Sequence, residues 1–152
     1  MSYHSGGMQL LIRRGFKFEL KPNGMQIQLM KQFCGCARYV YNRTLSLEKS
    51  LYKKDSKHSF KYTEAANRLP EWKKKNPFLK ECHSQVLQQS LKDLDQAYTN
   101  FFRKQANFPR YKKKFQHDSI RFPQGVELDE VKQQIRVPKI GWMGYRLSLI
   151  HI

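Results

Sequence analysis

The pattern of apolar and polar positions divides the chain into a strand, a helical middle and a second set of strands. From Gln9 to Lys21 apolar residues mostly alternate with polar ones, which predicts a strand with one buried face. Residues 24–53 and 83–102 carry apolar residues at spacings of three and four, which predicts amphipathic helices. Further strands are predicted around residues 120–128 and 135–142, with Trp142 in the core. We expect the N-terminal strand to pair with these, giving an α+β fold.

Signals at the helix ends define the helical middle more closely. Asn23 is predicted to cap the first long helix, and Gln26 completes a capping-box pair with it. Thr63 is predicted to cap a second helix, which should end near Leu69 because Pro70 disfavours a helix interior. Together with the helix of residues 83–102, these segments are expected to form a small antiparallel bundle.

These elements imply a helical insertion in a split β domain. We assign residues 8–22 and 116–146 to the β domain and residues 23–115 to the helical domain. Residues 1–7 are expected to be an unstructured leader. Residues 147–152 (LSLIHI) fit no predicted element and resemble translated sequencing adapter, so we expect the natural protein to continue past Arg146.

The charge balance changes the picture, because it implies a polyanionic partner. Lys and Arg outnumber Asp and Glu 29 to 12 in 152 residues, and the net charge is +17. Such self-repulsion favours a nucleic-acid partner. A merely soluble surface and an anionic membrane are the alternatives, although no apolar run approaches the ~18 residues of a membrane span.

Cysteine and histidine spacing gives no sign of a metal site. Cys34 and Cys36 lie two apart in a predicted helix and so point to different faces, which is not the CxxC spacing of a zinc site. We expect these thiols and Cys82 to be buried and reduced, which indicates a cytosolic compartment. No cofactor is predicted for this chain.

Five segments, in order, resemble the N-terminal part of the OrfB/TnpB proteins of insertion sequences. The resemblance covers about residues 8–146 and is carried by RRGFKFELKPN (13–23), FCGCARYVYNRTL (33–45), HSQVLQQSLKDLDQAYTNFFRK (83–104), FPRYKKK (108–114) and VPKIGWMGYR (137–146). That family has been described both as transposases with an N-terminal helix-turn-helix and as RNA-guided DNA endonucleases.

The resemblance implies a β-barrel-like wedge domain, partly incomplete here, that is split by a helical recognition domain. A RuvC nuclease domain with catalytic metal, and a structural zinc ribbon, follow it in the family. The residues that hold those metals lie downstream of the matched part. We therefore expect this chain to bind nucleic acid without cutting it, with no catalytic or metal-binding residue of its own.

The resemblance also implies which side chains read the DNA motif beside the target. They are Tyr62, Ser84, Gln85 and Gln88, with Phe122, Pro123 and Gln124 less certainly aligned. A Gln amide offers a donor and an acceptor together, which suits an adenine edge. Some relatives have Lys and Phe at the positions of Ser84 and Gln85, so the motif read can differ between members. A solvated helix face is the alternative interpretation.

Basic and aromatic residues supply the candidate backbone contacts. The predicted phosphate-binding residues are Arg38, Arg43, Lys49, Arg103, Lys104, Arg110, Lys112, Lys113, Lys114 and Arg121. Phe108 and Tyr111 can stack on bases, although a Phe-Pro pair more often packs against a bundle. Asn42, in an otherwise apolar stretch, is predicted to have a hydrogen-bonded structural role.

The partners expected from these features are double-stranded target DNA and a transposon-derived guide RNA. Two other functions fit the same residues. One is a transposase helix-turn-helix that binds DNA without RNA, and the other is a structural RNA-binding protein. The sequence leaves the oligomeric state open.

Overall fold

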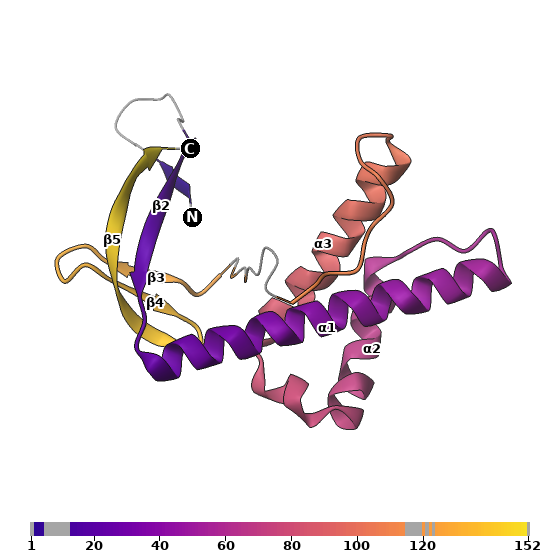
Figure 1. Ribbon diagram of the computed structural model, residues 1–152, viewed down its shortest axis with the longest axis horizontal. Helices are drawn as coiled ribbons and strands as arrows, with labels where there is room; N and C mark the ends of the chain where they lie inside the picture. Colours follow the sequence, from indigo (N-terminus) through magenta and orange to yellow (C-terminus); the bar gives the residue numbers. More distant parts are fainter. Residues whose placement is uncertain (1, 5–12, 115–119, 121, 123, 152) are drawn as a thin grey trace. The chain divides into compact units, whose positions relative to one another are not determined.

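The computed structural model describes residues 2–4, 13–114, 120, 122 and 124–151, and the chain divides into two compact units (Figure 1). One unit comprises residues 1–27 and 125–152, and the other comprises residues 28–124. The elements are β1 (Ser2–His4), β2 (Arg13–Lys21), α1 (Gly24–Lys54), α2 (Tyr62–Lys75), the 3₁₀ helix η1 (Pro77–Glu81), α3 (Ser84–Phe102), β3 (Glu127–Asp129), β4 (Gln134–Val137) and β5 (Gly141–His151). The α+β class is therefore confirmed.

The β unit is an open antiparallel sheet in the order β1-β2-β5-β4-β3. Leu20 pairs with Tyr145 and Lys21 with Gly144, so the N-terminal strand does pair with the C-terminal ones. Within the described residues, β1 and β3 each pair on one side only, and the sheet does not close into a barrel.

The ends of the chain differ from their predicted state. Ser2–His4 forms strand β1 against β2, where we expected an unstructured leader. Strand β5 extends to His151, with Leu147 paired to Phe18, so residues 147–151 belong to the sheet. Backbone pairing along β2 accommodates these residues whatever their origin.

The prediction that Trp142 lies in the core is wrong. Trp142 is 45% exposed and pairs with the exposed Arg136, whereas its neighbour Met143 is 2% exposed and pairs with the buried Ile135. Directly paired residues share one face of a sheet. Gly141, the first residue of β5, has φ +93°. The turn that ends there shifts the inward and outward alternation of the side chains, so that Met143 faces inward.

The start of α1 confirms the predicted capping box. The Gln26 N–H donates to Asn23 Oδ1 at 2.8 Å, and the Asn23 N–H donates to Gln26 Oε1 at 2.9 Å. The Gln26 amide nitrogen also donates to the carbonyl oxygen of Trp142 at 2.9 Å. One side chain thus satisfies the helix end and fixes it to β5.

Helix α2 contradicts two predictions. Lys61, not Thr63, occupies the N-cap position, and no side chain caps the helix. The helix also continues through Pro70 to Lys75 instead of ending near Leu69. Its buried residues are Ala65, Leu69 and Trp72. Their spacing of four and three requires an unbroken helix, and burying them outweighs the hydrogen bond that Pro70 removes.

The helical unit is held by the contact between α1 and α3. Its fully buried apolar side chains include Phe33, Val40 and Leu45 from α1 and Leu87, Leu91 and Leu94 from α3. Ser90 Oγ donates to the carbonyl oxygen of Ala37 at 2.7 Å where the helices meet. Figure 1 shows α2 and α3 crossing α1 steeply instead of running antiparallel along it, which corrects the predicted bundle.

A buried carboxylate joins α1 to α2. Glu48 is 4% exposed, and its carboxylate contacts His58 Nε2 at 2.5 Å and Arg68 at 3.2 Å. A buried charge needs such partners, because burial removes its hydration. No spacing or motif in the sequence indicated this cluster.

Thr44 leads to the first prediction, because its buried hydroxyl has no hydrogen-bond partner among the described residues. We expect Thr44→Val to raise the free energy of unfolding by about 1–3 kcal/mol, since it removes an unsatisfied polar group with little change in shape. Thr63→Val, at an exposed position in α2, is the matched control and should have little effect. Urea denaturation of both variants measures this, and a loss of stability in Thr44→Val would contradict it.

Candidate nucleic-acid interface

The first turn of α3 is fixed by the residue that precedes it. His83 is the N-cap, and its Nδ1 accepts a hydrogen bond from the Gln85 N–H at 3.1 Å. The same ring packs edge-on against Phe122 at 5.9 Å between centroids. The predicted reading residues therefore begin on an anchored helix end.

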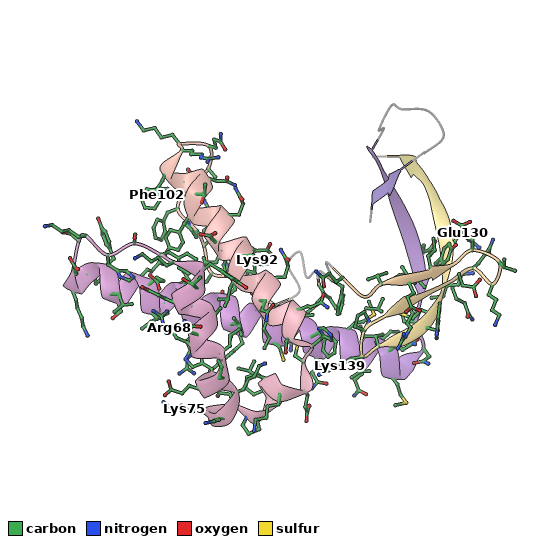
Figure 2. All side chains as sticks on the ribbon, turned by 180° about the vertical axis from the view of Figure 1, so that it is seen from behind. Arg68, Lys75, Lys92, Phe102, Glu130 and Lys139 are labelled. Carbon is green, nitrogen blue, oxygen red and sulfur yellow. The ribbon has the colours of Figure 1, made fainter. Side chains whose placement is uncertain are left out.

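A polar surface follows along α3, and we call it the amide face. It consists of Tyr62, Ser84, Gln85, Gln88 and Lys92, of which Tyr62 and Gln85 are half-buried and the others exposed. Lys73 Nζ donates to Ser84 Oγ at 3.3 Å, and Lys92 Nζ lies 5.7 Å from the centre of the Tyr62 ring. Figure 2 shows Lys92 partway along α3. The structure thus places Tyr62 of α2 beside Lys92, one helical turn from the predicted Gln88.

The two glutamines of the amide face differ in their freedom to bind a ligand. Gln85 Oε1 accepts a hydrogen bond from the Gln124 N–H at 3.2 Å, which places Gln124 beside the face. Gln88 is exposed, and the described residues give its amide no hydrogen-bond partner. Gln88 therefore keeps both a donor and an acceptor available.

Phe122, one of the predicted reading residues, packs against other aromatic rings. Its ring lies 6.5 Å from that of the buried Phe33 as well as against His83. Ile120, Phe122 and Gln124 fall in the helical unit and form no strand, unlike the predicted assignment of residues 116–146 to the β domain. Arg121 and Pro123 lie outside the described residues.

Residues 103–114, which we call the basic strap, return from the end of α3 toward α1 (Figure 1). Asn42 holds the strap with two hydrogen bonds. Its Nδ2 donates to the carbonyl oxygen of Lys112 at 2.9 Å, and its Oδ1 accepts from the Lys112 N–H at 2.7 Å. This confirms the hydrogen bonds predicted for Asn42, but its side chain is half-buried where a buried position was expected.

Aromatic rings position the strap's side chains. Lys112 Nζ lies 4.4 Å from the centre of the Tyr41 ring, and Lys49 Nζ lies 4.4 Å from that of Tyr111. Phe108 packs edge-on against Tyr98 at 5.6 Å and also against Phe101. Phe108 thus packs on the helices, the alternative to base stacking that the sequence left open.

The remaining predicted phosphate contacts fall into two groups. Those exposed on the strap are Arg103, Lys104, Arg110, Lys113 and Lys114. Arg38 and Arg43 instead line a groove of 990 Å³ along α1. The Arg43 guanidinium lies 4.8 Å from the centre of the Trp72 ring and donates a hydrogen bond to the Tyr39 hydroxyl. That packing fixes the position of Arg43.

The thiols are placed in the interior. Cys36 and Cys82 are buried, and Cys34 is partly buried. A hydrogen bond with Cys82 lowers the pKa of Cys36, against the opposing effects of burial and of the Glu81 carboxylate. Among the described residues, no group of three or more His, Cys, Asp or Glu side chains is placed to hold a metal ion.

In the part of the chain that the structure describes, none of the helices combines the length and apolar character needed to cross a bilayer.

A polar helix face, a basic strap and a net charge of +17 are the features of a nucleic-acid-binding module. A helix-turn-helix domain, HTH_OrfB_IS605, matches residues 8–57. The chain is 47% identical over 137 residues to a protein of Escherichia coli (strain K12) named "Putative RNA-guided DNA endonuclease InsQ". It is 37% identical over 108 residues to a protein of Streptomyces pristinaespiralis named "Putative RNA-guided DNA endonuclease".

These alignments cover 89% and 69% of this chain but 34% and 26% of the two relatives. The chain thus spans about a third of the length of the curated relatives that it matches. The domain match and the 47% identity support an N-terminal fragment of the OrfB/TnpB family. The family and the charge of +17 support a nucleic-acid-binding, transposase-related role.

The helix-turn-helix match does not identify which helix would contact bases, because the matched residues end before α2 and α3 begin. Among the described residues of 8–57, the regular elements are strand β2 and the single long helix α1. A second helix begins only at Tyr62. The amide face is therefore argued from its own geometry.

Several residues of the interface were missed at the sequence level. His83 acts through its cap and its contact with Phe122, and Lys73 and Lys92 flank the amide face. Lys92 lies four residues after Gln88, so helical spacing could have indicated it. Lys73 comes from α2, and the sequence held no signal for that contact.

The hydrogen bonds of Asn42 predict how the strap responds to its removal. In Asn42→Leu, the Lys112 amide should lose its protection against hydrogen exchange, because its acceptor is gone while the side-chain volume is retained. Asn67→Leu, at an exposed position of α2, should leave that amide protected. Hydrogen exchange resolved at Lys112 tests this, and equal protection in both variants would show that Asn42 does not hold the strap.

Proposed function

We propose that this chain is the recognition part of an RNA-guided DNA endonuclease, which reads bases beside the target in double-stranded DNA and holds a transposon-derived guide RNA. The observation that carries the proposal is that one helical unit holds both the amide face, with its exposed Gln88, and a basic strap whose backbone is held at Lys112 by Asn42. The residues of this chain are assigned to binding and not to cleavage.

Base reading by the amide face follows from the size and chemistry of α3. The major groove of B-DNA, about 12 Å wide, admits an α-helix. Gln88 offers the donor and acceptor that pair with N7 and N6 of adenine. The Gln85 side-chain oxygen already accepts a hydrogen bond from the Gln124 N–H. The Gln85 amide nitrogen is therefore the group that we propose as a donor to a base. Tyr62 and Ser84 border the two glutamines and are proposed to contact the same base pairs or their sugars.

Phosphate binding is assigned to the strap and to the groove along α1. The hydrogen bonds of Asn42 fix the backbone at Lys112, so the cations that follow need little ordering on binding. Arg38 and Arg43, in the groove, are proposed as a second backbone contact, suited to the guide RNA. In the longer protein we propose that further strands complete the open sheet into a wedge-like barrel.

Two alternatives differ in the nucleic acid they require. A helix-turn-helix transposase module would bind DNA without RNA, and a structural RNA-binding protein would not need DNA. Sequencing the nucleic acid that purifies with the chain separates them. A defined noncoding RNA from a transposon end supports the proposal, whereas its absence removes the guide-RNA part.

The strap predicts a change in salt dependence. The slope of log K against log salt for duplex DNA is negative. Replacing Lys112, Lys113 and Lys114 by Gln should reduce its magnitude by roughly 2–3, since each phosphate contact contributes about 0.9. A matched control replaces the exposed Lys74, Lys75 and Lys80 by Gln, which changes the net charge equally. Fluorescence anisotropy across a salt series measures both. Equal slopes in the two variants would mean that net charge, and not the strap, determines binding.

The amide face predicts a change in sequence preference. Gln88→Ala should relax selection at one base pair by roughly 1–3 kcal/mol, because the paired donor and acceptor are lost. Gln96→Ala, exposed farther along α3, is the control and should leave preference unchanged. Selection from a randomised duplex library followed by sequencing gives the comparison. An unchanged preference in Gln88→Ala would exclude Gln88 as a reading residue.

A further inference from the structure

A second feature of the helical unit, the aromatic pocket, lies where the C-terminal end of α3 meets α1. Its volume is 520 Å³, and its lining includes Phe60, Tyr98, Phe102 and Phe108 with Lys49 and Lys53. Small-molecule sites usually measure about 300–1,000 Å³. The pocket is therefore large enough for a planar ring system such as a nucleobase.

Three of its rings form a nearly parallel column. Phe60 and Tyr98 are 5.4 Å apart with 18° between their planes, and Tyr98 and Phe102 are 6.4 Å apart with 19° between theirs. Phe102 ends the column and is 70% exposed. Figure 2 shows it at the far end of α3 from the helix start. One more planar ring would extend this column in register.

The charges around the pocket favour an anionic ligand. Lys49 and Lys53 line it, and Arg103 and Lys104 follow Phe102 directly. The acidic side chain among the described lining residues is Glu48. Its carboxylate forms an ion pair with Arg68 and contacts the His58 ring. Burial and the nearby Glu48 raise the pKa of Tyr98 to about 12, so its hydroxyl stays a neutral donor at physiological pH.

We propose that the aromatic pocket binds an unstacked base of single-stranded nucleic acid, with the base on Phe102 and its phosphate near Lys49 and Lys53. The inference rests on the proposed nucleic-acid-binding function and adds a second, separate contact to it. Base–aromatic stacking tolerates any sequence, because every base has a π face. Bases in an intact duplex are already stacked, so this pocket selects single strands.

The alternative occupant is an apolar segment of protein. Such a segment would cover the exposed Phe102 but would leave Lys49 and Lys53 without a counter-charge. A nucleotide satisfies the rings and the lysines together. The charge complementarity therefore favours nucleic acid over a protein segment.

The test compares a 12-nucleotide oligothymidylate with an abasic strand of the same length and charge. The unaltered chain should bind the first probe roughly 5- to 150-fold more tightly, the range that one stacked base contributes. Phe102→Leu should lose most of that preference, and Phe102→Trp should restore it. Trp142→Leu removes an aromatic residue of the β unit that is 45% exposed and is the control, which should keep the preference.

Crosslinking locates the contact. With one 5-iodouracil in the oligothymidylate, light should join the probe to the peptide that contains Phe102. Equal affinity for both probes, a preference that survives in Phe102→Leu, or crosslinks only to other peptides would overturn the inference.

Duplex DNA distinguishes this inference from the proposed function. Phe102→Leu should bind duplex as the unaltered chain does, whereas the strap variant should not. If duplex binding depends on the strap but the two single-stranded probes bind alike, only the pocket inference fails. If the unaltered chain binds none of these nucleic acids, both fail.

Discussion

Burial at the crossing of α1 and α3 is the interaction on which the helical unit depends. Leu45 of α1 and Leu91 and Leu94 of α3 are fully buried there. Such side chains each contribute about 1.5–3 kcal/mol through burial, and the steep crossing concentrates them at one point. Because one face of α3 packs in this contact, its polar residues lie elsewhere on the helix, where Ser84 and Lys92 contact Lys73 and Tyr62 of α2. The same crossing places Asn42 beside the returning strap, so that packing, and not a ligand, sets the strap's backbone.

Several basic side chains of the helical unit lie against aromatic rings and not against carboxylates. Arg43 packs on Trp72, Lys49 on Tyr111 and Lys112 on Tyr41. A ring face attracts a cation without neutralising it, so the charge remains available to phosphate. Carboxylates at these positions would compete with the nucleic acid. Glu48 is different, because its buried carboxylate does pair with basic side chains. Its partners, His58 of the connecting segment and Arg68 of α2, hold that segment and α2 to α1.

The sequence predicted local features well and contacts between distant segments poorly. The cap at Asn23 and the hydrogen-bonded role of Asn42 depend on a residue's own chemistry in a helix, which a single sequence contains. The continuation of α2 through Pro70 depends on burial of Trp72, which helix propensity does not include. The error at Trp142 has a similar cause, since a turn of a few residues decides which of two neighbours faces inward. For the site, the helix and its amides were predictable, whereas the flanking Lys73 and the packing of Phe122 came from tertiary structure.

The arrangement along α3 suits the two nucleic-acid contacts that we propose for this helix. Its first turn is rigid, because His83 caps it, and rigid amides suit the fixed geometry of base edges in a groove. Its last turn ends in Phe102, where ring faces and nearby cations suit a base that has left its stack. A helix of 19 residues spans about 28 Å at 1.5 Å per residue, so the two contacts cannot share one base pair. A protein that opens a duplex needs both, because bases must be recognised while paired and held after they separate.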